Sequence, residues 1–212
     1  MTSIAQTLFE AQSRGLDRLD AQMLLLHALG HSAHDRAWLL AHDFDALPAA
    51  VQVTFDALTR RRAGGEPLAY ITGHKEFFGL DLQVDARVLV PRPDTETLVE
   101  WALEVLEVTT VPNAGSARAE PAEAPSATTL SVIDLGTGSG AVALALKHTR
   151  PTLRLSATDA SADALQVARA NAVRLQLPIE FIRGSWLTPI EGRYHAIVSN
   201  PPYIAAQDQH LP

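Results

Sequence analysis

A glycine-rich run between an apolar segment and an alanine-rich segment constrains the fold of this chain more than any other feature. Residues 130–135 are mostly apolar, and Gly136-Thr137-Gly138-Ser139-Gly140 follows them directly. The segment that comes next has the composition of a helix through Lys147. Glycine lets the backbone of such a loop approach a ligand closely. The run therefore predicts a buried strand, a tight loop that can face a ligand, and a helix.

The same alternation continues to the end of the chain. Further apolar strands are predicted at 153–158, 179–182 and 195–199, and an alanine-rich helix at 161–175. Strands that alternate with helices are typical of a parallel sheet with right-handed crossovers. We therefore expect an α/β fold.

The segments before the glycine-rich run differ from this pattern. Apolar residues at helical spacing predict four short helices within residues 1–65. From 66 to 93 the apolar residues alternate and Gly73 and Gly79 favour turns, which predicts a β-hairpin linker. A third domain is expected at 94–212. It opens with a helix whose predicted apolar face consists of Leu98, Trp101, Ala102, Val105 and Leu106. Within it, residues 109–129 are rich in Ala, Pro, Ser, Thr and Glu, which predicts a flexible insertion.

Two carboxylates end the first two strands of the alternation. Asp134 can receive a cofactor's ammonium group, directly or through water, and Asp159 can accept hydrogen bonds from both hydroxyls of a ribose. Nicotinamide and flavin sites use similar glycine-rich loops. No Lys or Arg that could hold a phosphate lies in this loop, however. These details favour S-adenosylmethionine over a dinucleotide, and the position of Asp159 disfavours a turn without a ligand.

The last predicted strand ends in Asn200-Pro201-Pro202-Tyr203. Two prolines cannot extend a central strand, because neither has an N–H to donate. An amide or aromatic amine is a poor nucleophile, so a site must hold its nitrogen with the lone pair aimed at a methyl carbon. The Asn200 side chain and the Pro201 carbonyl can accept the two N–H groups of such a target, and Tyr203 can pack on its flat face. The motif predicts methylation of a planar nitrogen.

The amino-acid composition limits the kinds of ligand and partner that the chain is expected to bind. The chain has 212 residues, no cysteine and a formal charge of −7, from 24 acidic and 17 basic residues. The lack of cysteine excludes disulfides and cysteine-ligated zinc, and it fits a reducing cytoplasm. The one dense basic run, Arg60-Arg61-Arg62, would point its side chains in different directions on a helix, so nucleic acid is disfavoured as the main partner. We expect neither a membrane span nor a secretory signal.

Together the two motifs resemble class I methyltransferases that modify planar nitrogens, among them DNA amino-methyltransferases and protein glutamine methyltransferases. Three upstream segments closely resemble the release factor glutamine methyltransferase family (also called PrmC or HemK). They are Pro67-Leu68-Ala69-Tyr70-Ile71-Thr72-Gly73, Glu76-Phe77-Phe78-Gly79, and Val88-Leu89-Val90-Pro91-Arg92-Pro93-Asp94-Thr95-Glu96. The resemblance covers nearly the whole chain except 109–129.

The resemblance implies a Rossmann-like class I S-adenosylmethionine-dependent methyltransferase domain at 94–212, after a helical substrate-docking domain at 1–65 and the hairpin linker at 66–93. It implies methyl transfer, without a metal, to the glutamine of the Gly-Gly-Gln motif in class I peptide chain release factors in the cytoplasm. No stable binding to nucleic acid or membrane is expected. The cofactor residues would be Asp134, Gly136, Thr137, Gly138, Ser139, Gly140, Asp159, Trp186 and Asn200. The catalytic and substrate-binding residues would be Asn200, Pro201, Pro202 and Tyr203.

The chain departs from the family at its end. It stops at Pro212, whereas the family continues with further strands, so we expect an incomplete sheet and either a fragment or a truncated reading frame. Three alternatives remain open. One is a DNA or RNA amino-methyltransferase, which would need a base-flipping pocket and a basic groove. The others are a glutamine methyltransferase acting on a ribosomal protein and an inactive, truncated fragment that binds S-adenosylmethionine.

Overall fold

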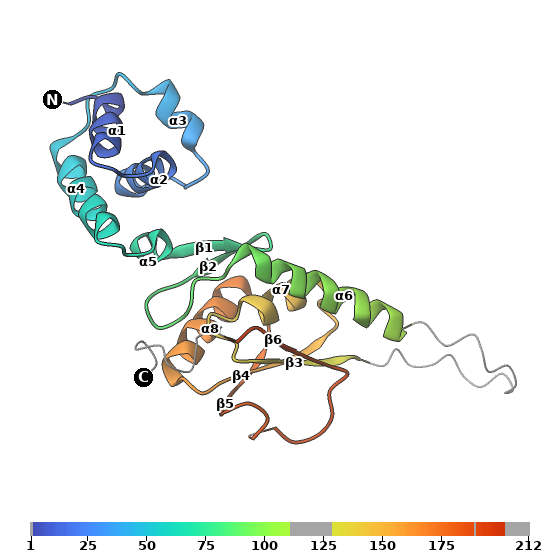
Figure 1. The fold of residues 1–212 in the computed structure, drawn as a ribbon. Coiled ribbons are helices and arrows are strands. Elements are labelled where there is room, and N and C mark those ends of the chain that lie inside the picture. The colour runs from blue at the N-terminus through green and yellow to red at the C-terminus, as the bar shows by residue number, and fades with distance from the viewer. Residues whose placement is uncertain (1, 111–128, 189, 202–212) are drawn as a thin grey trace, which may run out of the picture. The chain divides into compact units, whose positions relative to one another are not determined.

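A computed structural model describes residues 2–110, 129–188 and 190–201. The chain divides into two compact units, Met1–His74 and Lys75–Pro212 (Figure 1). Most of the predicted insertion at 109–129 lies outside the described residues, as do Pro202 and Tyr203. No helix in the described ranges is both long and apolar enough to cross a membrane.

The first unit is a bundle of short helices. Side chains cap the first two: the Ser3 hydroxyl accepts the Gln6 N–H, and the Asp17 carboxylate accepts the Leu19 N–H. Gly30 ends the second helix with a φ of 77°, a left-handed conformation that suits glycine. The helices of this unit are α1 (Ile4–Ser13), α2 (Arg18–Leu29), α3 (Arg36–Ala41), α4 (Ala49–Ala63) and α5 (Leu68–Thr72).

The core of the bundle forms around α2. Leu24, Leu25 and Leu26 of this helix are fully buried, and Phe55 of α4 packs in the same cluster. Burial of side chains of this size stabilises a fold by roughly 1.5–3 kcal/mol each. The Arg62 guanidinium of α4 also pairs with the Asp20 carboxylate of α2 at 2.6 Å. Apolar packing and this ion pair both hold α2 against α4.

The predicted hairpin at 66–93 is shorter than expected. Its strands are only β1 (His74–Phe77) and β2 (Leu80–Gln83), and Leu68–Thr72 forms α5 instead of an extended strand. The aromatic and β-branched residues suggested a strand, but Pro67 at the start and Gly73 at the end, with a φ of 77°, are typical boundaries of a helix. Residues 84–92 form no regular strand, although Val84 and Val88 are buried.

The second unit contains the predicted parallel sheet. Its strands are β3 (Ser131–Leu135), β4 (Arg154–Asp159), β5 (Glu180–Arg183) and β6 (Ala196–Ser199), in the order β5-β4-β3-β6. All three pairings are parallel. Each strand begins one residue later than predicted. The helices of this unit are α6 (Glu96–Thr110), α7 (Ala141–Thr149) and α8 (Ala162–Leu175), and a 3-10 turn, η1 (Pro93–Thr95), precedes α6. The α/β fold is thereby confirmed.

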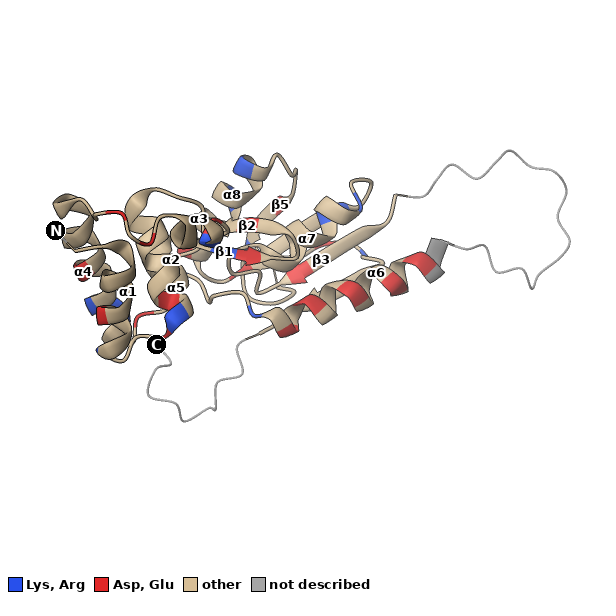
Figure 2. Ribbon diagram, turned by 90° about the horizontal axis from the view of Figure 1, so that it is seen from above, with Lys and Arg blue, Asp and Glu red and all other residues tan. Residues whose placement is uncertain are grey.

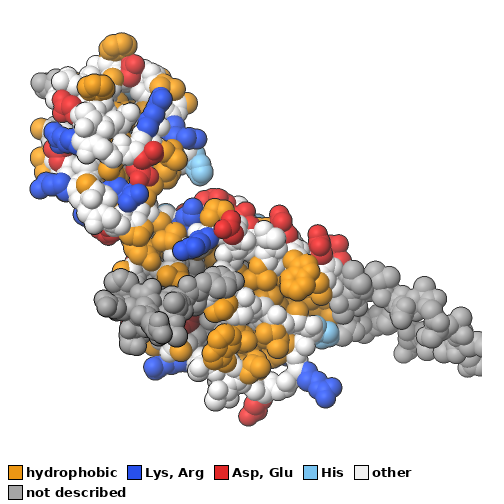
Figure 3. Space-filling model, viewed as in Figure 1, with side chains coloured by type: hydrophobic (Ala, Val, Ile, Leu, Met, Phe, Trp, Pro, Cys, Tyr) orange, Lys and Arg blue, Asp and Glu red, His pale blue; other side chains and the backbone are white. Residues whose placement is uncertain are grey.

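The predicted apolar face of α6 is only partly right. Ala102 and Leu106 are buried together with Val99, but Trp101 and Val105 are 63% and 42% exposed. Figure 2 shows acidic residues recurring along the ribbon of this helix, and among them Glu100 and Glu104 are exposed. Figure 3 shows that hydrophobic side chains also reach the surface of both units. The buried face of α6 is therefore narrower than the sequence pattern indicates.

Candidate functional site

The glycine-rich run joins β3 to α7 as a tight loop tied to β4. The N–H groups of Gly136 and Thr137 both donate to the Thr158 carbonyl, each at 2.9 Å. Gly136, Gly138 and Gly140 have positive φ angles of 71°, 55° and 85°. Since residues other than glycine rarely adopt these φ angles, the loop needs glycine at these positions.

The surroundings of two loop glycines differ. A Cβ at Gly140 would lie 3.0 Å from Leu144 Cδ1 and 3.3 Å from the Ala168 Cβ, so this glycine lets the loop pack against α8. A Cβ at Gly138 would meet nothing within 4 Å. Gly138 therefore presents bare backbone to open space, as a loop that faces a ligand requires.

Asp134 is a buried carboxyl group at the end of β3. Its Oδ2 accepts the Thr137 hydroxyl at 2.7 Å. Burial raises the pKa of Asp134 from 3.8 to about 6, against the hydrogen bond from Thr137, which lowers it. The negative charge of Asp159 is a smaller contribution to the same rise in pKa. A cation near this carboxyl would stabilise its charged form, as the prediction of a bound ammonium group requires.

Asp159 ends β4, the neighbour of β3. Its Oδ2 accepts the Gly138 N–H and its Oδ1 accepts the Ser161 N–H, both at 2.9 Å. A carboxylate has about four lone-pair sites, so these two bonds leave capacity for ribose hydroxyls. The structure thus brings Asp159, which is predicted to bind a ribose, next to the glycine loop at the carboxyl edge of the sheet.

Trp186 lies in the turn that follows β5. The Gly184 N–H donates to the Asp159 carbonyl at 3.0 Å, which holds this turn beside the end of β4. Trp186 has a φ of 50° and is 60% exposed. The Trp186 side chain therefore does not belong to the core. Trp186 lies two residues after Gly184, which is bonded to Asp159.

Asn200 follows β6 on the other side of β3. The Ser199 hydroxyl donates to the Leu135 carbonyl at 2.9 Å, which ties the ends of the two strands together. The Asn200 side-chain N–H donates to the Thr95 hydroxyl at 2.8 Å. Asn200 and Pro201 therefore begin at the same sheet edge as the glycine loop. Pro202 and Tyr203, predicted with them, lie outside the described residues.

Two of the segments that resemble the family, residues 76–79 and 88–96, are bonded to each other. The Glu96 carboxylate accepts the Phe78 N–H at 3.0 Å, and the Glu76 carboxylate accepts the Gly79 N–H at 2.7 Å. Phe78 has a φ of 50° in this turn. The carboxylates thus stabilise a tight turn and attach it to the start of α6.

One buried polar residue was not predicted from the sequence. Asn171 of α8 is fully buried, and its carboxamide accepts the Gln83 N–H at 2.8 Å and donates to the carbonyls of Gln83 and Ser139 at 2.9 and 3.0 Å. It thereby connects the hairpin to the glycine loop. The sequence does contain a feature that could have indicated this role: a carboxamide three residues after Ala168, on the apolar face of an alanine-rich helix.

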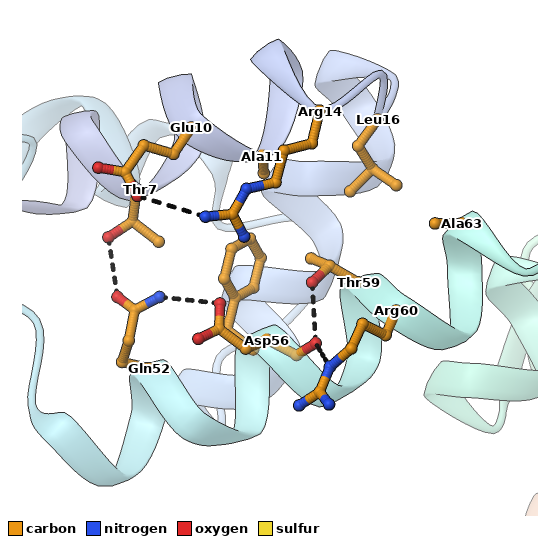
Figure 4. Close-up of a pocket in the computed structure, with 11 residues that line it drawn as sticks. Thr7, Glu10, Ala11, Arg14, Leu16, Gln52, Asp56, Thr59, Arg60 and Ala63 are labelled. Carbon is orange, nitrogen blue, oxygen red and sulfur yellow. Dashed lines mark hydrogen bonds and ion pairs between the residues drawn. The ribbon is translucent and has the colours of Figure 1, made fainter.

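A pocket of about 250 Å³ lies between α1 and α4 of the first unit (Figure 4). The Thr7 hydroxyl donates to the Gln52 carboxamide, which donates in turn to the Asp56 carboxylate, each at 3.1 Å. This chain of bonds connects the two helices, so the network has a structural role.

Two parts of the sequence match models of known protein families. Residues 2–73 match "PrmC N-terminal domain", and residues 122–211 match "Methyltransferase small domain". Among solved structures, the human methyltransferase 10 domain containing protein resembles the chain only loosely, with 20% identity, a TM-score of 0.45, and an alignment over 71% of this chain and 64% of that one.

Curated relatives cover nearly the whole chain. A release factor glutamine methyltransferase of Bordetella pertussis is 46% identical over 93% of this chain and 66% of its own length. Those of Burkholderia pseudomallei and Xylella fastidiosa (strain 9a5c) are 42% and 44% identical over 92% and 96% of this chain and 64% and 67% of their own lengths. The chain thus spans about two thirds of the length of these relatives. It belongs to the release factor glutamine methyltransferase family.

Proposed function

We propose that this protein transfers a methyl group from S-adenosylmethionine to the side-chain amide nitrogen of the glutamine in the Gly-Gly-Gln motif of class I peptide chain release factors. One observation carries the proposal. The glycine loop and Asp159 follow β3 and β4, Asn200 follows β6, and β3 lies between β4 and β6. A cofactor site and an acceptor for amide N–H groups are therefore adjacent at one sheet edge. The names of the curated relatives support the substrate.

The residues of the cofactor edge fit S-adenosylmethionine. Open space beside Gly138 accommodates a ligand, and Asp159 retains lone pairs for ribose hydroxyls. The raised pKa of Asp134 suits a carboxyl that is completed by an ammonium group. The cofactor, when bound, supplies an electrophilic methyl group on a sulfonium. The residues that we assign to it are Asp134, Gly136, Thr137, Gly138, Ser139, Gly140, Asp159, Trp186 and Asn200.

The acceptor side of the site works by positioning. The amide nitrogen of glutamine is weakly nucleophilic because its lone pair is delocalised. The Asn200 Oδ1 and the Pro201 carbonyl accept the two N–H groups of this nitrogen and turn its lone pair toward the methyl carbon, while Pro202 stiffens the loop and Tyr203 packs on the amide plane. Preorganised acceptors of this kind act on the transition state without a general base, since the proton leaves after transfer.

The helical first unit is the proposed docking surface for the release factor, in the cytoplasm where translation takes place. The formal charge of −7 makes duplex DNA the less favourable partner.

The test supplies radiolabelled S-adenosylmethionine with three acceptors: a class I release factor, its Gly-Gly-Gln variant with Gln→Ala, and plasmid DNA. Label on the intact factor alone is the expected result. Label on DNA, or equal label on the Gln→Ala factor, would contradict the proposal. In the same assay Asn200→Ala should lose transfer. In calorimetry its cofactor affinity should change less than its transfer rate, whereas Asp159→Ala should weaken cofactor binding by about 1–3 kcal/mol.

A further inference from the structure

The Asn200 carboxamide is held from one side by a threonine. Its Nδ2 donates to the Thr95 hydroxyl oxygen at 2.8 Å. Thr95 is itself fixed by its backbone, since its N–H donates to the Arg92 carbonyl at 3.0 Å in the turn η1. Ser199, next to Asn200, is bonded to β3 through its hydroxyl. Both the backbone and the side chain of Asn200 therefore have defined anchors.

The residue after Thr95 extends this anchoring to the hairpin. Glu96 accepts the Phe78 N–H at 3.0 Å. The turn between Arg92 and Glu96 thus has one contact with the hairpin and another with Asn200. These contacts hold the turn and thereby fix the position of the Thr95 hydroxyl.

The direction of the Thr95 bond matters for chemistry. A carboxamide presents an acceptor, Oδ1, on one side and a donor, Nδ2, on the other. A primary amide that approaches nitrogen first offers two N–H donors, so it needs acceptors. If Nδ2 of Asn200 faced it, two donors would meet. The hydroxyl of Thr95 engages Nδ2, and this leaves Oδ1 as the outward end of the carboxamide.

We propose that Thr95 is a positioning residue for methyl transfer, which fixes the Asn200 carboxamide in the one orientation that accepts an N–H of the target amide. The inference rests on the proposed function, because it assigns Asn200 the acceptor role described above. Thr95 touches neither the target nor the methyl group and acts through Asn200.

The first experiment tests the contact without any substrate. In the ¹⁵N-labelled protein, the side-chain amide signals of Asn200 are those lost in Asn200→Ala. In the wild type and in Thr95→Ser, which keeps the hydroxyl, one of these protons should exchange slowly with water. In Thr95→Val, which keeps the shape and removes the hydroxyl, it should exchange several-fold faster. Unchanged signals in Thr95→Val would overturn the proposal.

The second experiment tests the consequence for catalysis. Thr95→Val should lower kcat on a release factor about 10- to 100-fold, the order expected for a misplaced catalytic contact. Cofactor affinity and the thermal midpoint should stay close to those of the wild type, and Thr95→Ser should restore most of the rate. Thr97→Val is the matched control, because Thr97 is exposed on the first turn of α6 and should change nothing.

A double-mutant cycle separates action through Asn200 from a general structural effect. In an Asn200→Ala background, Thr95→Val should cause no further loss of kcat. A full additional loss there would show that Thr95 acts independently of Asn200 and would overturn the proposal. If the wild-type protein methylates no release factor at all, the proposed function fails, whereas the amide signals still decide the contact.

Discussion

The buried carboxyl of Asp134 links the stability of the second unit to pH. Because burial raises its pKa to about 6, the folded protein binds this proton more tightly than the unfolded chain does. The free energy of unfolding should therefore decrease as the pH rises from about 4 to about 6, where the unfolded carboxyl is ionised and the folded one is still protonated. Above that window the folded protein retains the full cost of a buried charge.

Replacing Asp134 with asparagine should remove this cost. Urea unfolding at pH 5 and pH 7.5, without cofactor, should show that the wild type loses stability relative to Asp134→Asn as the pH rises. The contribution of Asp134 over the whole range is roughly 2–3 kcal/mol, of which the interval between these two values covers a part. The same pH dependence in both proteins would show that Asp134 is not the group responsible.

Gly138 and Gly140 provide a matched pair. Gly140→Ala should destabilise the protein by roughly 2–4 kcal/mol, because the new Cβ collides with Leu144 and Ala168 in addition to the strain of a φ of 85°. Gly138→Ala has only the backbone cost of roughly 1–2 kcal/mol. Its methyl group lies in the proposed cofactor space, however, so affinity for S-adenosylmethionine should fall. Chemical denaturation and calorimetry measure the two effects, and an unchanged cofactor affinity in Gly138→Ala would remove that residue from the site.

Single residues could be predicted from the sequence where local rules apply. The ends of β3 and β4 follow from apolar runs that stop at a carboxylate and glycines, and so does the proximity of Asp134, Gly138 and Asp159. The contact between Thr95 and Asn200 could not be predicted, because 105 residues separate the partners. Nothing in a local pattern specifies such a pairing.

Among the elements, the β/α alternation was the most predictable part. The two inner strands, β3 and β4, are largely buried, and the boundaries of the elements coincide with turn residues. Short elements were less predictable. In α5, bulky residues favoured a strand, but the positions of Pro67 and Gly73 determine a single helical turn. In α6, the exposed Trp101 shows that an apolar side chain does not by itself identify the buried face.

Asn171 joins three elements, the hairpin, the glycine loop and α8. Asn171→Leu should lower the free energy of unfolding by roughly 2–4 kcal/mol, because the buried Ser139 carbonyl and the partly buried backbone groups of Gln83 lose their partner. Gln83→Ala is the control, since its backbone keeps both bonds and its exposed side chain does not make them. A urea series compares the two variants. Equal stabilities would contradict a connecting role for Asn171.

At the scale of the whole molecule, the outer strands of the described sheet differ in charge. β5 carries Glu180 and Arg183 at its ends, whereas β6 has no charged residue and leaves Ile197 55% exposed. Uncharged edge strands readily pair with other chains. We expect this polypeptide to self-associate through β6 as its concentration rises.

Ile197→Lys should reduce this association, as measured by sedimentation velocity over a concentration series. Val173→Lys is the control, because Val173 is 79% exposed on α8, away from the β6 edge. If the two substitutions reduced association equally, the β6 edge would not be the contact.

The strand order also has a consequence for the sequence of events during synthesis. β3 pairs with β4 after a single intervening helix, but it acquires β6 only after β4, α8 and β5 have been made. Since a ribosome releases the chain from its N-terminus, the edge with the glycine loop and Asp159 can assemble while the segment with Asn200 is still being translated. A nascent chain would therefore complete the proposed site for S-adenosylmethionine before it completes the proposed site for the acceptor amide.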